Sequence, residues 1–257
     1  MNGPNLRKHE QFASRFLRNR RDIAVYLPPG YDSQDQRRFP VLYMQDGQNL
    51  FDGETAFVRG RHWRMGETAD DCIHRGEVEP LIIVGIYNMG KSRVREYTPT
   101  WVVKHGGGGA DRYGKFLVEE LMPFVQTVYR IKARAENTAI GGSSLGGLVS
   151  LYLGLKMPGL FGKIAALSPS VWWDRGRIER FAAAAKLPSC PRTWLDIGTR
   201  EGPRIVDQVE RFRDVLLRKG WRLDGDLHFE CVEGGEHDED AWARRVAPFL
   251  RFLFPSK

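Results

Sequence analysis

The sequence predicts an α/β fold in which helices cover both faces of a mostly parallel central sheet. Strand and helix patterns alternate through the last two thirds of the 257 residues, as they do in sheets built from β–α–β units. The opening third instead contains strand patterns divided by short turns, and we expect these N-terminal strands to run antiparallel. Because the chain shows no internal repeat and no linker composition, residues 1–257 are expected to form a single domain.

The individual elements follow from local periodicity and from the residues that end each run. Strands are expected at 21–27, 39–44, 81–87, 137–141, 163–167, 192–197 and 227–232, and helices at 68–74, 111–128, 148–155, 178–185, 206–217 and 242–254. Asp111 is expected to cap the helix that it begins, since its carboxylate can accept from a free backbone N–H. Four glycines at 106–109 lack the Gly-Lys-Ser/Thr of a phosphate loop, and they predict a mobile loop.

Composition and charge exclude several classes of protein. The apolar fraction of 42% and the charged fraction of 28% are ordinary for a globular protein. The net charge of +7 comes mostly from arginines in small groups without a long basic run. This pattern indicates a solvated basic surface rather than a nucleic-acid-binding face, although the field would favour an acidic substrate.

Cysteine usage and the N-terminus bear on the compartment. Cys72, Cys190 and Cys231 are widely separated, so neither a disulfide framework nor a zinc site is predicted. Residues 1–17 carry several charges and no apolar stretch, and nothing in the chain approaches the length of a membrane span. We therefore expect a cytoplasmic protein that needs no metal or cofactor and has neither a membrane nor a nucleic acid as partner.

The pentapeptide at 142–146 fits the pattern G-x-S-x-G. A short apolar run ending in glycine precedes it, and leucines at helical spacing follow it until Met157-Pro158. Between a strand and a helix, such a serine is held on a strained turn with its hydroxyl exposed, and the flanking glycines are needed because the turn is too tight for Cβ atoms. The context predicts a nucleophilic Ser144; the alternative is a glycine-rich turn with no catalytic role.

A serine nucleophile needs a base to take its proton and a third group to orient that base. In α/β-hydrolases these partners follow in the order serine, acid, histidine. His237 lies in a loop directly after the strand at 227–232, where its imidazole can reach the elbow. His228 lies inside that strand, so we expect the sheet to hold its side chain. His237 is the predicted base, with a plain surface histidine as the alternative.

The orienting acid is expected at Glu201, in a glycine-bounded loop after the strand at 192–197. Three other carboxylates remain candidates for this acid. Asp196 lies inside the strand, Asp207 lies one turn into a helix, and Asp174 follows a tryptophan pair. The oxyanion of an acyl-transfer intermediate requires backbone donors, and we expect them at Leu145 and at Gln48.

Several segments together resemble a known family. They are Tyr26–Tyr31, Val41–Phe51, Gly141–Gly147, Ser168–Ser170 with Trp172 and Trp173, and Gly235–His237 with Trp242. In combination they are similar to the bacterial Putative esterase family, which includes esterase D, feruloyl and acetylxylan esterases, enterobactin esterases and mycolyltransferases. The resemblance spans about residues 21–254. It implies an α/β-hydrolase fold, a triad on Ser144 and His237, and an acid at Glu201, where many relatives have aspartate.

Further residues are candidates for substrate contact. Trp172 and Trp173 follow the strand beside the elbow, and either they line a substrate pocket or they cap the core. Arg95 and Tyr97 are expected near the mouth of the site, where they and the following glycine run could form part of a lid; a structural turn is the favoured alternative. The predicted function is a cofactor-free serine esterase acting on a small-molecule ester. An acyltransferase using the same acyl-enzyme, or a non-catalytic binding protein on a hydrolase scaffold, are the alternatives.

Overall fold

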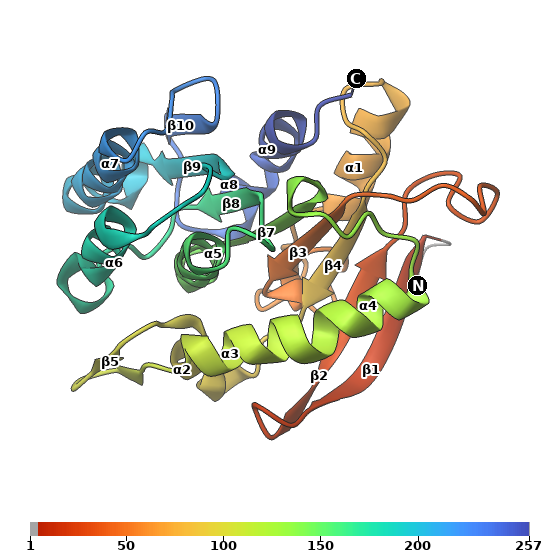
Figure 1. Ribbon diagram of the computed structural model, residues 1–257, viewed down its shortest axis with the longest axis horizontal. Helices are drawn as coiled ribbons and strands as arrows, with labels where there is room; N and C mark the ends of the chain where they lie inside the picture. Colours follow the sequence, from red (N-terminus) through yellow and green to blue (C-terminus); the bar gives the residue numbers. More distant parts are fainter. Residues whose placement is uncertain (1–4, 257) are drawn as a thin grey trace.

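The computed structural model describes residues 5–256 and contains one large sheet between two layers of helices (Figure 1). Within these residues the sheet has eight strands in the order β1-β2-β4-β3-β7-β8-β9-β10. The strands are β1 (Leu6–Ser14), β2 (Asn19–Tyr26), β3 (Val41–Gln45), β4 (Ile82–Ile86), β7 (Thr138–Ser143), β8 (Lys163–Leu167), β9 (Arg192–Gly198) and β10 (Leu227–Val232). Residues 1–4 of the N-terminal segment discussed above lie outside the described part.

The strand directions are those expected from the sequence. All pairings from β4 through β3 and β7 to β10 are parallel, whereas β1 pairs with β2, and β2 with β4, in the antiparallel sense. The central strands are apolar and buried along their whole length, as β4 illustrates with the sequence IIVGI. Helices on both faces require such sequences. The expected α/β-hydrolase fold is therefore confirmed.

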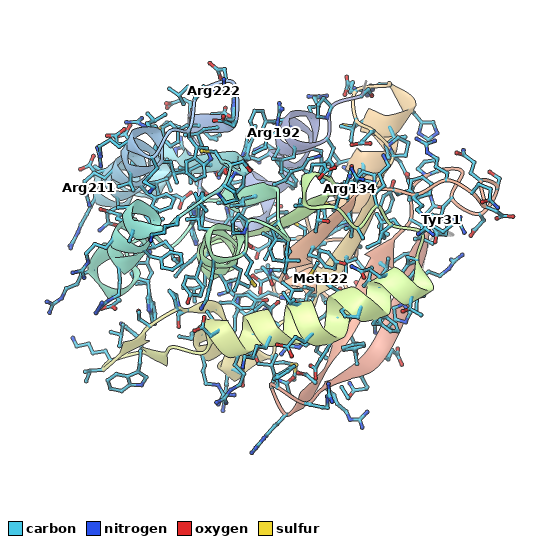
Figure 2. All side chains as sticks on the ribbon, in the orientation of Figure 1. Tyr31, Met122, Arg134, Arg192, Arg211 and Arg222 are labelled. Carbon is cyan, nitrogen blue, oxygen red and sulfur yellow. The ribbon has the colours of Figure 1, made fainter. Side chains whose placement is uncertain are left out.

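Two apolar cores occupy the two faces of the sheet, and Figure 2 shows side chains filling the space between the sheet and the helices. One face is covered by α1 (Met65–His74) and α9 (Val246–Leu253). The other is covered by α3 (Ala110–Phe116), α4 (Met122–Val128), α5 (Leu145–Lys156), α6 (Trp173–Ala184) and α7 (Pro203–Arg218). Short helices α2 (Arg93–Tyr97) and α8 (Glu239–Ala243) lie in connections.

Several local predictions were wrong. Strand β1 was not predicted, because as an edge strand it carries many exposed polar residues in place of a buried alternation. Asp111 does not cap its helix, which begins one residue earlier, and its carboxylate accepts from Tyr152 and Lys156 instead. The glycine run contributes to a small hairpin, β5 (Trp101–Val102) with β6 (Gly106–Gly107). The closing helix is divided into α8 and α9.

In the part of the chain that the structure describes, no helix is both long enough and apolar enough to cross a membrane.

Candidate active site

Ser144 lies on the sharp turn between β7 and α5, with φ 56° and ψ −124°. A side chain with a Cβ is strained at positive φ. Neighbouring glycines make the turn possible: a Cβ on Gly142 would lie 2.9 Å from Gln45 Cβ, and one on Gly146 would lie 3.0 Å from the same atom. Strand β3 passes so close that only glycine fits. Because Leu145 is the first residue of α5, its N–H is free of the helix's own hydrogen bonds.

His237 and Glu201 are joined by a short hydrogen bond. His237 Nδ1 lies 2.6 Å from Glu201 Oε2, and Nδ1–H donates to the carboxylate when the latter is ionised. The imidazole packs edge-on against Trp242, with ring centroids 4.9 Å apart. These two contacts orient the ring and leave Nε2 available for proton transfer.

The carboxylate of Glu201 is almost fully enclosed, with 2% of its side chain exposed. Its second oxygen accepts from Ser168 Oγ at 2.5 Å and from the Gly198 N–H at 3.0 Å. Burial alone would raise the pKa of Glu201, but the hydrogen bonds from His237 and Ser168 outweigh it, and the pKa lies below its usual value. The group is therefore an anion when it faces the imidazole.

A buried polar network lies behind this carboxylate. Ser168 Oγ accepts from Arg245 Nη1 at 2.8 Å and from Trp242 Nε1 at 3.2 Å. Arg245 also donates to Asp196 at 2.7 Å, and neither charged side chain is more than 3% exposed. The Ser168 oxygen accepts from both of these N–H groups, so the Ser168 hydroxyl donates its own proton to Glu201. The sequence pattern offers no reason to assign a role to Arg245. Ser168 lies in a segment that carries the family resemblance and follows the strand beside the elbow, but no role was predicted for it.

The other candidates for acid and base are engaged elsewhere. Asp196 is the buried partner of Arg245, and Asp174 pairs with Arg177 at 2.9 Å. Asp207 is exposed on α7. His228 stacks on Trp194 with ring centroids 4.2 Å apart, held within the sheet as expected. Among the four carboxylates considered as the orienting acid, all in the described part of the chain, Glu201 is the one that contacts His237.

Gln48 lies in the short helix η1 (Gly47–Asn49) that follows β3. This segment is held by Asp46, whose carboxylate accepts two hydrogen bonds from Arg93, at 2.8 and 2.7 Å, and one from Asn88 at 2.7 Å. Asn88 N–H in turn donates to Gln48 Oε1 at 3.1 Å. A Cβ on Gly47 would lie 2.3 Å from the backbone of Gly85, so the segment sits directly against β4.

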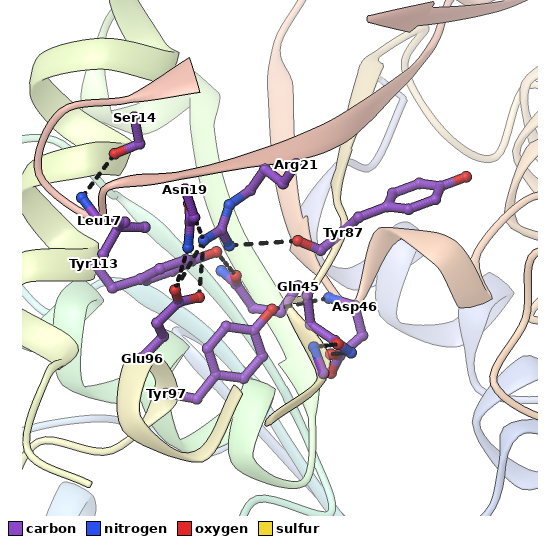
Figure 3. Close-up of polar contacts among 12 residues, drawn as sticks. Ser14, Leu17, Asn19, Arg21, Gln45, Asp46, Tyr87, Glu96, Tyr97 and Tyr113 are labelled. Atoms are coloured by element: carbon purple, nitrogen blue, oxygen red, sulfur yellow. Dashed lines mark hydrogen bonds and ion pairs between the residues drawn. The ribbon is translucent and has the colours of Figure 1, made fainter. Parts of the chain in front are cut away.

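Figure 3 shows the buried polar contacts beneath this segment. Tyr97 Oη accepts from the Asp46 N–H at 3.3 Å, and Tyr113 donates to Gln45. Arg21 forms a fully buried ion pair with Glu96 at 2.9 Å, which ties β2 to α2. Tyr97 is itself fully buried. Tyr97 therefore supports the segment after β3 from the protein interior and does not lie at the mouth of the site.

A cavity of about 530 Å³ opens at the carboxyl ends of the parallel strands, where α/β proteins bind ligands. Its lining includes Ser144, His237 and Gln48, together with Phe57 and Arg61 at its rim. Among residues 5–256 no hydrogen bond joins Ser144 to His237; Ser144 Oγ instead shares one of 3.3 Å with Ser170 Oγ.

The remaining predicted contact residues do not line this cavity. Trp173 is 4% exposed and donates to Thr100 O at 3.0 Å, so it caps the core. Trp172 is 39% exposed and borders a different hollow between α6 and α7. Arg95 borders a separate cavity, whose lining does not include Arg93. Trp173 and Tyr97 therefore have structural roles, which were the alternatives to substrate contact: Trp173 caps the core and Tyr97 supports a turn.

The fold and the strained serine turn define an α/β-hydrolase. Residues 14–253 match the family model described as "Putative esterase", and the chain belongs to this family. It is 31% identical to the ferri-bacillibactin esterase BesA of Bacillus subtilis, over 83% of this chain and 78% of that protein. It is 26% identical to the uncharacterized protein YbbA of the same organism, over 92% of this chain and 93% of that one.

The solved structures agree on the fold. The siderophore hydrolase EstA from Aspergillus nidulans superposes with a TM-score of 0.78 at 23% identity, covering 97% of this chain and 95% of that one. Family membership and the named relatives together identify the protein as a carboxylic ester hydrolase.

Proposed function

We propose that the protein is a serine esterase in which Ser144 is the nucleophile, His237 the general base and Glu201 the acid that orients the base. The observation that carries this proposal is the 2.6 Å contact between His237 and Glu201 at the rim of the cavity that Ser144 also lines. Ser144 and His237 both line this cavity, and the chain order serine, acid, histidine is the one typical of α/β-hydrolases.

In the proposed reaction, Ser144 Oγ attacks the ester carbonyl carbon while its proton passes to His237 Nε2. The Leu145 and Gln48 N–H groups stabilise the oxyanion, and Glu201 stabilises the imidazolium that forms. The imidazolium then protonates the departing alkoxide, which leaves an ester on Ser144. Water attacks that ester with the same base, releasing the acid and restoring the hydroxyl.

Ser144 must leave Ser170 and turn toward His237 for this reaction. Catalytic hydrogen bonds of unliganded enzymes are often long and tighten only when substrate binds. The 3.3 Å bond to Ser170 is weak by the usual geometric standard, so exchanging it costs little.

The proposed substrate is a small-molecule ester. Two relatives are named as siderophore esterases, and BesA is named as a ferri-bacillibactin esterase. In this chain, Phe57 is 84% exposed and lines the cavity, so it would contact the part of the substrate outside the ester by apolar contact. Arg61 also lines the cavity, but its charge is paired with Asp238 at 3.5 Å and with Asp240 at 3.2 Å.

Replacement of the nucleophile tests the proposal. Ser144→Ala should lower kcat for p-nitrophenyl acetate by at least about 10⁴-fold without loss of fold, because the acyl-enzyme can no longer form. A fluorophosphonate probe should label the wild type but not this variant. Ser170→Ala is the matched control: it removes a neighbouring hydroxyl and should still be labelled. Wild-type turnover or labelling by Ser144→Ala would contradict the proposal.

A further inference from the structure

A second cavity, of about 910 Å³, is larger than the one at Ser144 and shares none of its lining residues with it. It lies between the β1–β2 turn, α2, the glycine segment after β5 and the start of α3, a region at the lower edge of Figure 1. These walls come from three parts of the chain that are far apart in sequence. Nothing in the proposed esterase mechanism uses this cavity.

The lining is strongly basic. It contains five cationic side chains and one carboxylate: Arg15, Arg18, Arg95, Arg112 and Lys115 against Asp111. The carboxylate is already neutralised by Lys156, at 2.5 Å. Of the five cations, Arg15 pairs with Glu120 at 3.3 Å.

In the described part of the chain the other four cations are not held by an ion pair, although Lys115 lies close enough to Asp111 to help lower the pKa of that carboxyl. Within residues 5–256, the side chains of Arg18, Arg95, Arg112 and Lys115 form no ion pair and no hydrogen bond, although all four residues are exposed. Some other surface arginines are paired, as Arg59 is with Glu54 and Arg222 with Asp226, whereas Arg180 and Arg204 form no ion pair within the described residues. What the four cations share is that they line one concave surface. Like charges around one concave surface repel each other, and an anion in the cavity would relieve that repulsion.

The backbone adds a second observation. Arg18 has φ 53°, a conformation that favours glycine or asparagine, and it lies in the turn that faces the cavity. An αL residue is common at the end of a β-hairpin turn, and here this conformation places Arg18 on the cavity wall.

Apolar side chains project from the hairpin beside the cavity. Gly107 and Gly108 contribute to the cavity wall, and the same β5–β6 hairpin carries Trp101, which is 64% exposed, and Val103, which is 83% exposed. An exposed tryptophan and valine next to unpaired cations form a surface that is both apolar and basic.

We propose that this cavity is a binding site for a phosphate-bearing anion. Arginine pairs with two phosphate oxygens at once, and lysine provides a compact charge, so four unpaired cations suit a ligand with more than one negative charge. Such a ligand is either a soluble polyphosphate or the headgroup of an anionic lipid. In the second case Trp101 and Val103 would enter the membrane interface while the cations hold the headgroups.

Calorimetric titration with inorganic pyrophosphate at low ionic strength tests the soluble source. Arg112→Gln/Lys115→Gln should weaken binding by about tenfold or more, because it removes two charge-assisted contacts. Arg180→Gln/Lys186→Gln removes one arginine and one lysine charge from exposed residues outside this cavity, and it should leave binding unchanged. Equal weakening by both variants would overturn the proposal, since it would show only the general field of a basic protein. Melting temperatures check that each variant folds.

Co-sedimentation with phosphatidylcholine vesicles, with and without phosphatidylglycerol, tests the lipid source. Binding that requires phosphatidylglycerol and is lost in Arg112→Gln/Lys115→Gln supports the site, and its loss in Trp101→Ser/Val103→Ser assigns the headgroup as the ligand. Such a result would also revise the expectation that the protein has no membrane partner. Ser144→Ala should bind pyrophosphate or vesicles as the wild type does, which separates this proposal from the esterase mechanism. No binding of either probe overturns it.

Discussion

At the scale of single residues, the site depends on a carboxylate that is kept ionised although it is buried. Enclosure raises the pKa of Glu201, and hydrogen bonds from His237, Ser168 and Gly198 lower it further than burial raises it. The Ser168 hydroxyl links the two charged groups: it accepts a hydrogen bond from Arg245 and donates one to Glu201, which helps to lower the pKa of Glu201. Both residues are positioning residues in the proposed mechanism.

The lowered pKa of Glu201 predicts a pH dependence of stability. A carboxyl whose folded-state pKa lies below its ordinary 4.5 stabilises the fold fully above that pH, and the contribution is lost as the pH falls through the folded-state pKa. The difference in free energy of unfolding between wild type and Glu201→Gln should therefore be constant near neutral pH and shrink in acid. Urea denaturation across the acid range measures it.

Glu236→Gln is the control for this experiment, since Glu236 is 55% exposed and its ion pair with Arg200 lies at the surface. It should change the unfolding free energy by less than about 1 kcal/mol. If the difference in free energy of unfolding between wild type and Glu201→Gln grew as the pH fell, the pKa of Glu201 would not be lowered in the folded protein.

At the scale of elements, the segment after β3 is positioned by α2. Arg93 at the start of α2 holds Asp46, while Glu96 and Tyr97 at its other end anchor the helix to β2 and to the backbone of Asp46. A short helix in a connection thus determines where the Gln48 N–H points.

Removal of the Arg93 side chain tests this role. In Arg93→Met the Asp46 carboxylate loses both hydrogen bonds from Arg93, and the Gln48 segment becomes free to shift. We expect kcat for p-nitrophenyl acetate to fall by about 10- to 100-fold, with little change in KM, because the oxyanion donor acts in the transition state. Lys91→Met, an exposed cation two residues earlier, should leave both constants unchanged. A change in KM alone would contradict a role in the transition state.

The buried ion pair between Arg21 and Glu96 predicts a large effect on stability. Arg21→Met leaves the Glu96 charge enclosed without its partner, which typically costs about 3–5 kcal/mol. Arg59→Met breaks the Arg59–Glu54 pair, whose side chains are 81% and 67% exposed, and it should cost less than about 1 kcal/mol. Urea denaturation of both variants makes the comparison. Similar small losses would show that the buried pair is dispensable.

At the scale of the whole molecule, one sheet supports both cores. Trp63 and Trp242 belong to the core on the α1 and α9 face, and Trp173 and Trp221 to the core on the opposite face. Because each strand from β3 to β9 presents residues to both cores, loss of one core removes the support of the other.

We therefore predict that the chain unfolds as a single domain. Far-UV circular dichroism and tryptophan fluorescence should report the same midpoint in urea, since the tryptophans sample both faces. Two separate transitions, or different midpoints from the two probes, would show that the faces unfold independently and would contradict the single-domain prediction.

Local sequence was enough to predict the strands of the central sheet. It also singled out Ser144, Glu201 and His237 as candidates, since they follow one another in the order typical of α/β-hydrolases. Apolar runs and glycine turns act over a few residues, so their consequences can be read directly from the pattern. Connections were harder to predict. The hairpin at the glycine run and the edge strand β1 depend on neighbours that the local pattern does not contain.

Only the tertiary structure decided which polar residues meet. Sequence alone could not show that Tyr97 lies buried beneath the Gln48 segment, that Ser168 links Arg245 to Glu201, or that four cations with no ion pair in the described part of the chain line one cavity. The physical reason is that hydrogen bonds and charge pairing act over a few ångströms in space, whereas these partners are separated by tens of residues along the chain. The amino-acid order determined the parallel sheet and its serine turn; the packing of distant segments determined what surrounds them.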